Sequence, residues 1–303
     1  MTAMNRGRTR PDTATGAELR ARLLNGAPVT DRRIDLAGVS TPVLEAGSGP
    51  PVVLLHGQGN FGASWLPILE PLAATHRVVA PDLPGLGVSE LLDREPDGPT
   101  VMAWLSELIA QTCDVRPALV GMSLGGSIAA RYAVDHSDRI SGLVLINSGS
   151  LGRRPPIRVL LPLIRHSVRP TERSARRMMS VVMLHPERAP EVFGHRFEPL
   201  QAYMLDRARN PSVQRANRRL LRELGLPPIS HDDLERISAP TTLICGRQDR
   251  VMKLRHAQQA SSRHGWPLEI IEDAGHVVFV DQREATVNAL NKALASSSDS
   301  GRP

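Results

Sequence analysis

The chain has 303 residues, which is enough for one large α/β domain or two small ones with a substantial core. Its hydrophobic content of 41% is typical of a soluble globular protein, and no apolar run approaches the length needed to cross a bilayer, so no integral membrane segment is expected. The formal net charge is +6, and two cysteines, Cys113 and Cys245, imply no disulfide framework, which favours a reducing, cytoplasmic location.

The sequence of residues 1–55 predicts a disordered arm, a helix and three strands. Residues 1–16 are rich in Arg and Thr and lack the apolar stretch of a signal peptide, so we expect a disordered arm. A short amphipathic helix is predicted at 17–24, and a hairpin of two strands at 32–36 and 41–45. The apolar run Pro51–Leu55 is typical of a strand that is buried on both faces of a parallel sheet.

Helices and strands then alternate as far as Gly149. Apolar spacing predicts helices at 64–75 and 101–112, the second with Thr100 as its N-cap, and a third that ends near His136. Strands are predicted between these helices at 77–80 and 118–120, and after the third helix at 140–147. This alternation predicts an α/β fold with a mostly parallel, doubly wound sheet.

The alternation stops after Gly149, and a region without predicted strands follows. Its helical pieces are predicted at 156–166, 174–184, 190–206 and 212–224. The α/β pattern then resumes with strands at 241–245 and 268–271, helices at 253–263 and 282–295, and a frayed tail at 296–303. We therefore divide the chain into a core of residues 17–150 and 236–296 and an inserted helical module of residues 151–235.

The helical module is strongly basic. Residues 151–222 contain sixteen Arg, no Lys and five acidic residues. Such a pattern favours either attraction of an anionic substrate or membrane surface, or solvated helix faces that use arginine. Nucleic acid is not a predicted partner, because no aromatic residues are interleaved with the charges. Met178, Met179 and Met183 in this module are interpreted either as the lining of an apolar pocket or as ordinary helix packing.

The stretch Pro117–Ala130, PALVGMSLGGSIAA, predicts a strand, a sharp turn and a helix with Ser123 at the tip of the turn. A serine there adopts a sparsely allowed backbone conformation, and Gly121 and Gly125 let strand and helix pack closely around it. The hydroxyl group is lifted clear of the sheet, beside the positive end of the helix. This G-x-S-x-G pattern is a nucleophile elbow, and a helix N-cap is the alternative interpretation of Ser123.

A serine nucleophile needs a base and a group that orients the base. We expect both in loops after later strands, because such sites open at the carboxyl ends of the strands. Asp249 follows the strand 241–245 and His276 follows the strand 268–271, which gives the chain order Ser, Asp, His. Asp273, three residues before His276, is the competing carboxylate, but we predict Asp249, because a base and its orienting group so close in sequence would rarely face each other.

Five motifs in this order resemble the α/β-hydrolase superfamily over about residues 30–295: HGQG at 56–59, DLPGLGVS at 82–89, GMSLGG at 121–126, GRQD at 246–249 and GH at 275–276. The resemblance implies the α/β-hydrolase fold with a helical cap, residues 151–235, inserted after the sixth strand. It also implies an oxyanion hole formed by the backbone N–H groups of Gln58 and Leu124.

The resemblance further implies structural roles for two polar residues and substrate contacts near the oxyanion hole. His56 is expected to brace its loop, and Asp82 to tie down the loop after its strand. The residues expected to contact the substrate are Gly57, Met122 and Val277.

The nucleophile narrows the function within this superfamily. A serine at position 123 disfavours haloalkane dehalogenases and epoxide hydrolases, which need an aspartate there. The motifs suit esterases and lactonases, so we predict a serine hydrolase that cleaves a small carboxylic ester or lactone through an acyl-enzyme intermediate. Hydrolases of carbon–carbon bonds in ring-fission products often carry Asn where Met122 stands; they, perhydrolases and a slow, receptor-like binding protein are the alternatives.

The expected partner is a small-molecule substrate, and the arginines of the cap suit one that bears a carboxylate. Acyl-enzyme chemistry needs no metal and no organic cofactor, and the sequence has no Cys/His spacing suited to zinc. The sequence leaves the oligomeric state open, with a homo-oligomer as one alternative.

Overall fold

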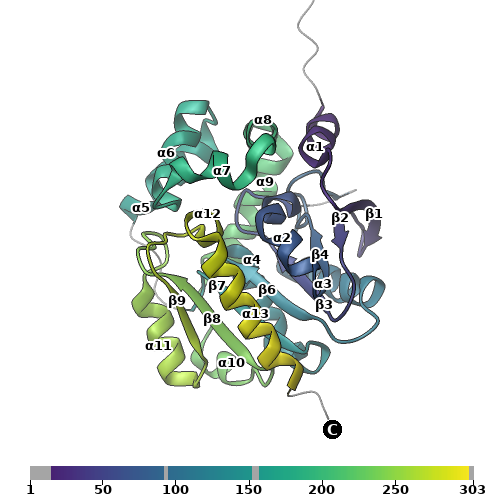
Figure 1. The fold of residues 1–303 in the computed structure, drawn as a ribbon, viewed down its shortest axis with the longest axis vertical. Coiled ribbons are helices and arrows are strands. Elements are labelled where there is room, and N and C mark those ends of the chain that lie inside the picture. The colour runs from purple at the N-terminus through teal and green to yellow at the C-terminus, as the bar shows by residue number, and fades with distance from the viewer. Residues whose placement is uncertain (1–14, 92–94, 152–156, 300–303) are drawn as a thin grey trace, which may run out of the picture.

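The computed structural model describes residues 15–91, 95–151 and 157–299 (Figure 1). Within them, nine strands form one sheet with the order β1-β2-β4-β3-β6-β7-β8-β9, and β5 pairs with β2. The strands are β1 (Thr30–Leu36), β2 (Val39–Ala46), β3 (Pro51–Leu55), β4 (Arg77–Pro81), β5 (Glu90–Leu91), β6 (Ala118–Met122), β7 (Gly142–Ile146), β8 (Thr241–Gly246) and β9 (Leu268–Ile271).

The sheet is mostly parallel, as predicted. β4, β3, β6, β7, β8 and β9 run parallel to one another, and only the pairs that involve β2 are antiparallel. The central strands are apolar along their whole length because both faces are covered. Because the central strands run parallel, their carboxyl ends lie side by side at the same end of the sheet, where the loops that follow them can meet.

Two layers of helices cover the sheet, and alternate residues of each central strand pack against opposite layers. Val53 and Leu55 pack with helices α3 (Gly98–Thr112), α4 (Leu124–His136) and α11 (Leu254–His264). Val52 and Leu54 pack with α1, α2, α12 and α13 on the other face. The bounds of these last helices are Gly16–Leu24, Leu66–Ala73, Val278–Asp281 and Arg283–Asp299.

Between β7 and β8 the described residues form helices and turns. Five of these helices lie together beyond the end of the sheet, whereas the short α10 (His231–Glu235) lies at the opposite end, beside α4 (Figure 1). The five are α5 (Ile157–Val168), α6 (Glu172–Val182), α7 (Ala189–Phe193), α8 (Phe197–Arg209) and α9 (Pro211–Leu220), the last of which continues into a π-helical turn, Leu221–Gly225. We call residues 157–225 the helical segment. No helix in the described parts of the chain is long and apolar enough to cross a membrane.

Several predicted boundaries were wrong for local reasons. The N-cap of α3 is Asp97, whose carboxylate accepts the N–H of Thr100 at 2.9 Å, so Thr100 lies inside the first turn. The helix predicted at 190–206 is interrupted at Gly194, which has a φ of +54°. The last helix, α13, extends through part of the predicted frayed tail to Asp299.

The predicted arm is described only at its end. Thr15 caps α1 through its side chain, which accepts the N–H of Glu18, and the carboxylate of Glu18 accepts the N–H of Thr15. Residues 1–14 of that arm, and residues 300–303 of the tail, lie outside the described residues. Helix α1 packs against α8, so the start of the described chain contacts the helical segment (Figure 1).

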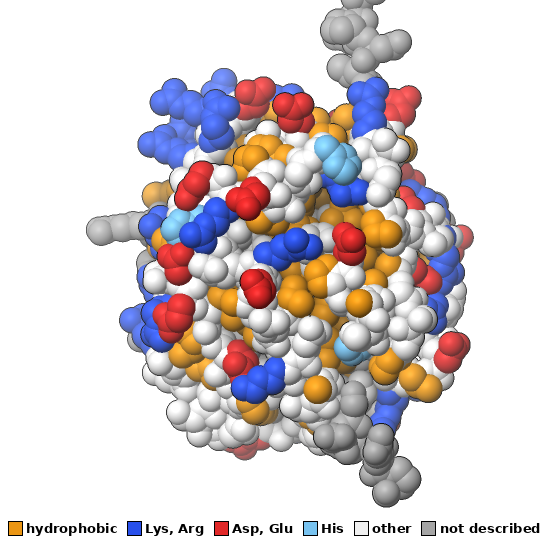
Figure 2. All heavy atoms as spheres, viewed as in Figure 1, with side chains coloured by type: hydrophobic (Ala, Val, Ile, Leu, Met, Phe, Trp, Pro, Cys, Tyr) orange, Lys and Arg blue, Asp and Glu red, His pale blue; other side chains and the backbone are white. Residues whose placement is uncertain are grey.

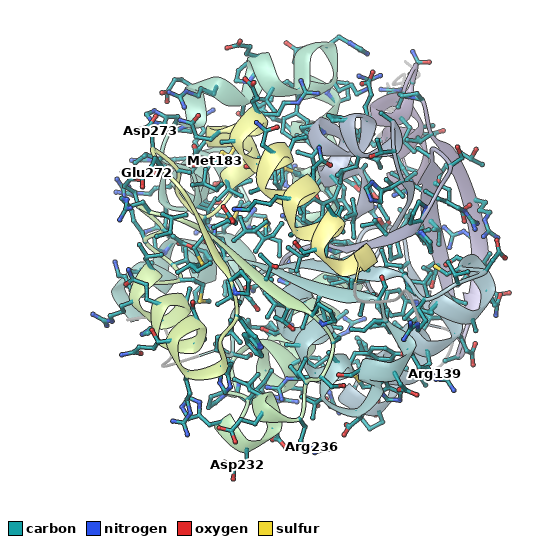
Figure 3. All side chains as sticks on the ribbon, turned by 60° about the horizontal axis from the view of Figure 1, so that its bottom comes forward. Arg139, Met183, Asp232, Arg236, Glu272 and Asp273 are labelled. Atoms are coloured by element: carbon teal, nitrogen blue, oxygen red, sulfur yellow. The ribbon has the colours of Figure 1, made fainter. Side chains whose placement is uncertain are left out.

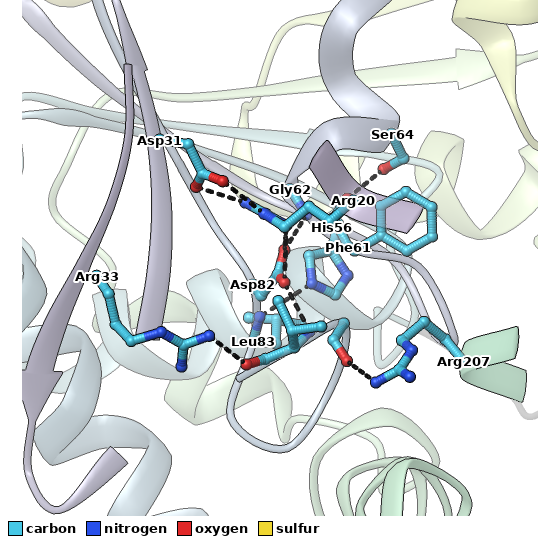
Figure 4. Close-up of polar contacts among 12 residues, drawn as sticks. Arg20, Asp31, Arg33, His56, Phe61, Gly62, Ser64, Asp82, Leu83 and Arg207 are labelled. Atoms are coloured by element: carbon cyan, nitrogen blue, oxygen red, sulfur yellow. Dashed lines mark hydrogen bonds and ion pairs between the residues drawn. The ribbon is translucent and has the colours of Figure 1, made fainter. Parts of the chain in front are cut away.

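A buried ion cluster joins α1 to the sheet (Figure 4). The guanidinium group of Arg20, only 3% exposed, donates to both oxygens of Asp31 at 2.9 and 3.0 Å and to both oxygens of Asp82 at 3.0 and 3.2 Å. Burial lowers the pKa of Arg20, but Asp82 and Asp31 outweigh burial and raise it above its ordinary value, so Arg20 stays charged. The N–H groups of Gly62 and Val88 complete the shell of Asp82, as expected for a residue that ties down its loop.

Replacing Arg20 by methionine is expected to lower the free energy of unfolding by about 3–5 kcal/mol, because the carboxylate of Asp82 would remain buried without its cation. Urea denaturation at neutral pH measures the change. The control is Arg22→Met on the exposed side of the same helix, for which we expect a change within about 0.5 kcal/mol. Equal destabilisation by the two substitutions would contradict a specific role for the buried cluster.

Candidate active site

Ser123 occupies the turn between β6 and α4 in the conformation that its sequence context predicts. Its backbone has a φ of 53° and a ψ of −113°, a region that costs a residue with a Cβ atom about 1–3 kcal/mol. The turn is held from both sides, because the N–H of Ser123 donates to the carbonyl of Ile146 in β7 at 3.0 Å and its own carbonyl accepts the N–H of Ser127 at 3.0 Å. The surrounding structure therefore compensates for the strained residue.

The two glycines of the elbow are required by backbone contacts. A Cβ atom on Gly121 would lie 2.5 Å from the carbonyl oxygen of Gly125, and one on Gly125 would lie 2.1 Å from the carbonyl oxygen of Leu55. Both distances are too short for any side chain. This close approach brings Ser123 beside the loop that follows β3, which carries Gly57 and Gln58.

His276 and Asp249 meet in the folded chain. Nδ1 of His276 lies 2.7 Å from Oδ2 of Asp249, and both residues are buried. The other carboxylate oxygen, Oδ1, accepts the N–H groups of Val251 and Met252 at 2.7 and 2.9 Å. These two donors fix the carboxylate of Asp249, which accepts the hydrogen bond from Nδ1 of His276.

The competing carboxylate, Asp273, does not contact His276. Its oxygens lie 2.8 Å from Nε2 of His185, 3.3 Å from Arg188 and 2.9 Å from Gln282, and its side chain is half exposed. The backbone of Asp273 has a φ of 52°, which turns the loop before it reaches His276. The geometry therefore pairs His276 with Asp249.

Two buried polar residues that the sequence did not single out hold the loop of His276. The amide of Asn147, at the end of β7, donates to the carbonyl of His276 at 2.8 Å and accepts the N–H of Gly246 at 3.1 Å. The carboxylate of Asp281 accepts the N–H of Gly275 at 2.8 Å. The position of Asn147 at the end of a buried strand could have indicated a role near the site, whereas nothing in the sequence around Asp281 indicates one.

Asp281 also ties this loop to the helical segment. Its carboxylate accepts the N–H groups of Leu184 at 3.0 Å and His185 at 2.7 Å, and Asp281 is 2% exposed. In addition, the carbonyl of Val182 at the end of α6 accepts the N–H groups of His276 and Val277 at 2.8 and 3.0 Å. The position of His276 thus depends on residues from both sides of the cavity.

Two backbone N–H groups near Ser123 are available to a ligand. Within the described residues, neither the N–H of Leu124, the first residue of α4, nor the N–H of Gln58 has a hydrogen-bond acceptor. The loop of Gln58 is fixed next to it, because the N–H of Gly59 donates to the side chain of Asn217 in α9 at 3.0 Å.

His56 braces the same loop, and Figure 4 shows its contact with Leu83. Its Nε2 accepts the N–H of Leu83 at 2.9 Å, so its proton lies on Nδ1, which donates to the carbonyl of Gly57 at 2.9 Å. Complete burial lowers the pKa of His56 to about 4, against the opposing effect of the Asp82 carboxylate. His56 is therefore neutral at pH 7 and structural, as expected.

A cavity of about 480 Å³ lies between the carboxyl ends of the strands and the helical segment. Most of its lining is apolar. The predicted site residues that line it are Gly57, Gln58, Met122, Ser123, Leu124, His276 and Val277, and Asp249 lies behind His276.

The helical segment contributes much of the apolar lining, including Met178, Met179 and Met183. Of its described arginines, only Arg218 lines the cavity, and Lys253 is the other cationic residue there. The described residues contain no cluster of His, Cys, Asp and Glu that could hold a metal ion.

The buried, neutral His56 predicts acid sensitivity. Between pH 6.5 and about 4 the unfolded chain binds a proton at this residue that the folded chain does not, so the free energy of unfolding falls as the pH is lowered. We expect a loss of about 3 kcal/mol from this residue between pH 7 and pH 4. Urea denaturation across that range, compared with His56→Gln, isolates the contribution.

In His56→Gln the free energy of unfolding should fall by about 3 kcal/mol less between pH 7 and pH 4 than in the parent protein. The variant is nevertheless expected to be less stable than the parent protein at pH 7. The control, His195→Gln, replaces an exposed histidine and should keep the slope of the parent protein. If the free energy of unfolding depends on pH equally in the parent protein and both variants, the acid sensitivity does not come from His56.

Comparisons with known proteins agree with this architecture. A model of the alpha/beta hydrolase family matches residues 52–289. The 2-hydroxy-6-oxo-6-(2'-aminophenyl)hexa-2,4-dienoic acid hydrolase of Metapseudomonas resinovorans is 26% identical over 282 residues, which cover 89% of this chain and 92% of that protein. The pimeloyl-(acyl-carrier protein) methyl ester esterase of Aliivibrio salmonicida is 28% identical over 261 residues, or 82% of this chain and 93% of that protein.

A solved structure agrees over almost the whole chain. The crystal structure of a membrane phospholipase A, a bacterial virulence factor, superimposes with a TM-score of 0.77 at 27% identity and covers 93% of this chain and 91% of that one. The family model extends from β3 into α13 and so includes the elbow, Asp249 and His276. The expected resemblance is confirmed: the chain belongs to the alpha/beta hydrolase family.

Proposed function

We propose that the protein is a serine hydrolase that cleaves carboxylic esters through an acyl-enzyme intermediate. Ser123 is the nucleophile, His276 the general base and acid, and Asp249 the residue that orients His276. One observation carries the proposal: a serine in a strained turn and a histidine bonded to a buried carboxylate line the same cavity. The strained conformation lowers the stability of the fold, and such conformations cluster at active sites, where they serve the mechanism.

The geometry supports the usual order of proton transfers. Because Nδ1 of His276 donates to Asp249, Nε2 accepts the proton of Ser123 as the hydroxyl oxygen attacks the ester carbonyl carbon. The tetrahedral intermediate collapses, the bond to the alcohol oxygen breaks, and His276 returns the proton to the leaving alcohol. Water then attacks the acyl-enzyme, with His276 again as base, and the carboxylic acid and free Ser123 are released.

The N–H groups of Gln58 and Leu124 are proposed to bind the negative oxygen of both tetrahedral intermediates. Neither has an acceptor among the described residues, and Leu124 lies at the positive end of α4. One such donor typically contributes about 3–4 kcal/mol to transition-state stabilisation. Gly57, Met122 and Val277 line the cavity around this position and are the proposed substrate contacts.

The apolar lining favours an ester with an apolar acyl group, since each buried CH₂ contributes about 0.8 kcal/mol. The esterase among the relatives supports this choice. Carbon–carbon bond cleavage is the second candidate. It is favoured by the relative named for a dienoic acid, and Arg218 and Lys253 in the cavity lining could pair with a substrate carboxylate.

Incubation with a fluorophosphonate should add one label to the protein, detected by intact-mass spectrometry. The label should be absent in Ser123→Ala, because the reactive oxygen is removed. The matched control is Ser127→Ala, which removes a neighbouring cavity serine and should keep the label. Ester turnover in Ser123→Ala and His276→Ala should fall by about 10⁴-fold or more.

A series of p-nitrophenyl esters from acetate to octanoate, run beside a 2-hydroxy-6-oxo-dienoate, separates the two candidates. We expect kcat/KM to rise about fourfold for each of the first added CH₂ groups. Turnover of the dienoate without turnover of any ester would replace the first candidate by the second. Labelling on a residue other than Ser123, or tight binding without product from either class, would reject both.

Asp281 is proposed to be a positioning residue for His276, because its carboxylate holds Gly275 and the end of α6 together. In Asp281→Asn we expect kcat for the best ester to fall at least about tenfold, since small displacements of a catalytic group cost up to about 10²-fold. KM should stay within about twofold, because Asp281 does not line the cavity.

The matched control is Asp273→Asn, in the same loop but without contact to His276, which should keep kcat within about twofold. Asp281→Glu should restore part of kcat, because it retains the negative acceptor. A lower melting temperature of Asp281→Asn with unchanged kcat would show that Asp281 supports only the fold.

A further inference from the structure

Helix α5 exposes apolar side chains on one side. Leu161 is 55% exposed, Ile164 43% and Val168 69%, and their spacing of three and four residues places them on one face of the helix. Across the residues that the structure describes, the one other large apolar side chain with comparable exposure is Val115, at 63%, far from α5 in the sequence. Ile164 and Val168 also belong to the cavity lining, whereas Leu161 does not, so the apolar face extends from the cavity onto the outer surface of the helix.

Arginines surround this apolar face. Arg165 and Arg169 are exposed at the end of α5, and Arg173, Arg176 and Arg177 are exposed on α6, which packs against α5. Figure 2 shows a dense group of cationic side chains at the upper left, where Figure 1 has α6. The opposite side of α6 carries Met178 and Met179, which line the cavity, so the arginines point outward.

Acidic residues do not neutralise this charge. Glu172 is the only acidic residue between positions 157 and 186. It lies 3.8 Å from Arg176 in a pair whose side chains are 75% and 69% exposed, so the pair contributes little. The outer surface of α5 and α6, which we call the α5–α6 surface (residues 161–177), is therefore both apolar and strongly cationic.

We propose that the α5–α6 surface binds the surface of an anionic lipid bilayer. The guanidinium groups are complementary to lipid phosphates, and the exposed Leu161, Ile164 and Val168 are suited to the boundary between headgroups and acyl chains. A second copy of the chain fits less well, because symmetric contact would bring the same arginines together. A nucleic acid would use the charge but leave the apolar face unexplained.

The same two helices border the cavity. Ile164 and Val168 from α5, with Met178 and Met179 from α6, belong to its lining. An apolar ester dissolved in the bilayer would thus reach the cavity beside the bound helices. This last step rests on the proposed function, whereas bilayer binding does not and is measured without any substrate.

Cosedimentation of the full chain with vesicles tests the proposal. The probe vesicles contain equal parts phosphatidylcholine and phosphatidylglycerol, and the reference vesicles phosphatidylcholine alone. We expect binding to the anionic vesicles that weakens as salt is raised, and at least about tenfold weaker binding to the neutral ones.

Replacing Arg173, Arg176 and Arg177 together by Gln should lower the partition coefficient about 100-fold at low salt. The matched single control is Arg139→Gln, an exposed arginine labelled in Figure 3 and located outside the α5–α6 surface, which should have little effect. Leu161→Ser should lower binding at least about threefold, whereas Val115→Ser, at similar exposure, should not.

Each variant is first checked for an unchanged melting temperature, so loss of binding cannot be assigned to unfolding. Equal binding to neutral and anionic vesicles, or an effect of Arg139→Gln as large as that of the triple variant, would overturn the proposal. Retention on duplex DNA without vesicle binding would also overturn it and assign the arginines to nucleic acid. If the protein does not bind vesicles but Ser123 is still labelled by the fluorophosphonate, bilayer binding is rejected and the proposed hydrolase function is not.

Discussion

The close backbone contact at the turn of Ser123 is the constraint on which the other features of the site depend. Strand β6 and helix α4 pass each other at Gly121 and Gly125 with no room for a Cβ atom, and the same approach reaches the carbonyl of Leu55 at the end of β3. Ser123 must then turn through a left-handed conformation to connect strand and helix. Close packing of three backbone segments thus places a serine, a helix N-terminus and the loop of Gln58 around one point.

The loops around that point are held by buried polar side chains. His56 and Asp82 fix the loops after β3 and β4, Asn147 joins the end of β7 to the loop of His276, and Asp281 joins that loop to the helical segment. Each group is buried and has several partners, which is the condition under which buried polar groups rigidify a structure. The helical segment is part of this frame because Leu184 and His185 are partners of Asp281 and Asn217 is the partner of Gly59.

Strands, elbow and the order of the site residues could be predicted because their causes are local. Continuous apolar runs such as Pro51–Leu55 specify strands buried on both faces, and the glycines at 121 and 125 specify the turn at Ser123. His276 and Asp249 followed from their positions after strands. The choice of Asp249 over Asp273 was also predicted, because a carboxylate three residues from His276 would rarely face it, and the folded chain pairs His276 with Asp249.

What could not be predicted depends on contacts between residues distant in the chain. Asp281 acts on Leu184 and His185, almost a hundred positions away, and nothing in its neighbourhood in the sequence indicates this. Short helices such as α10 and α12 have too few residues to show a period. Which arginines face the cavity also required the structure, because the sequence shows their number and not their direction.

The central claim is that Ser123, His276 and the N–H groups of Gln58 and Leu124 act on one reacting carbon. A crystal structure of the protein after reaction with a small phosphonate tests it most directly, because the phosphorus atom occupies the position of that carbon. We expect phosphorus bonded to Oγ of Ser123, with its charged oxygen within hydrogen-bond distance of both N–H groups and Nε2 of His276 facing the bonded serine oxygen. A phosphonate on another residue, or an oxygen directed away from both N–H groups, would contradict the account.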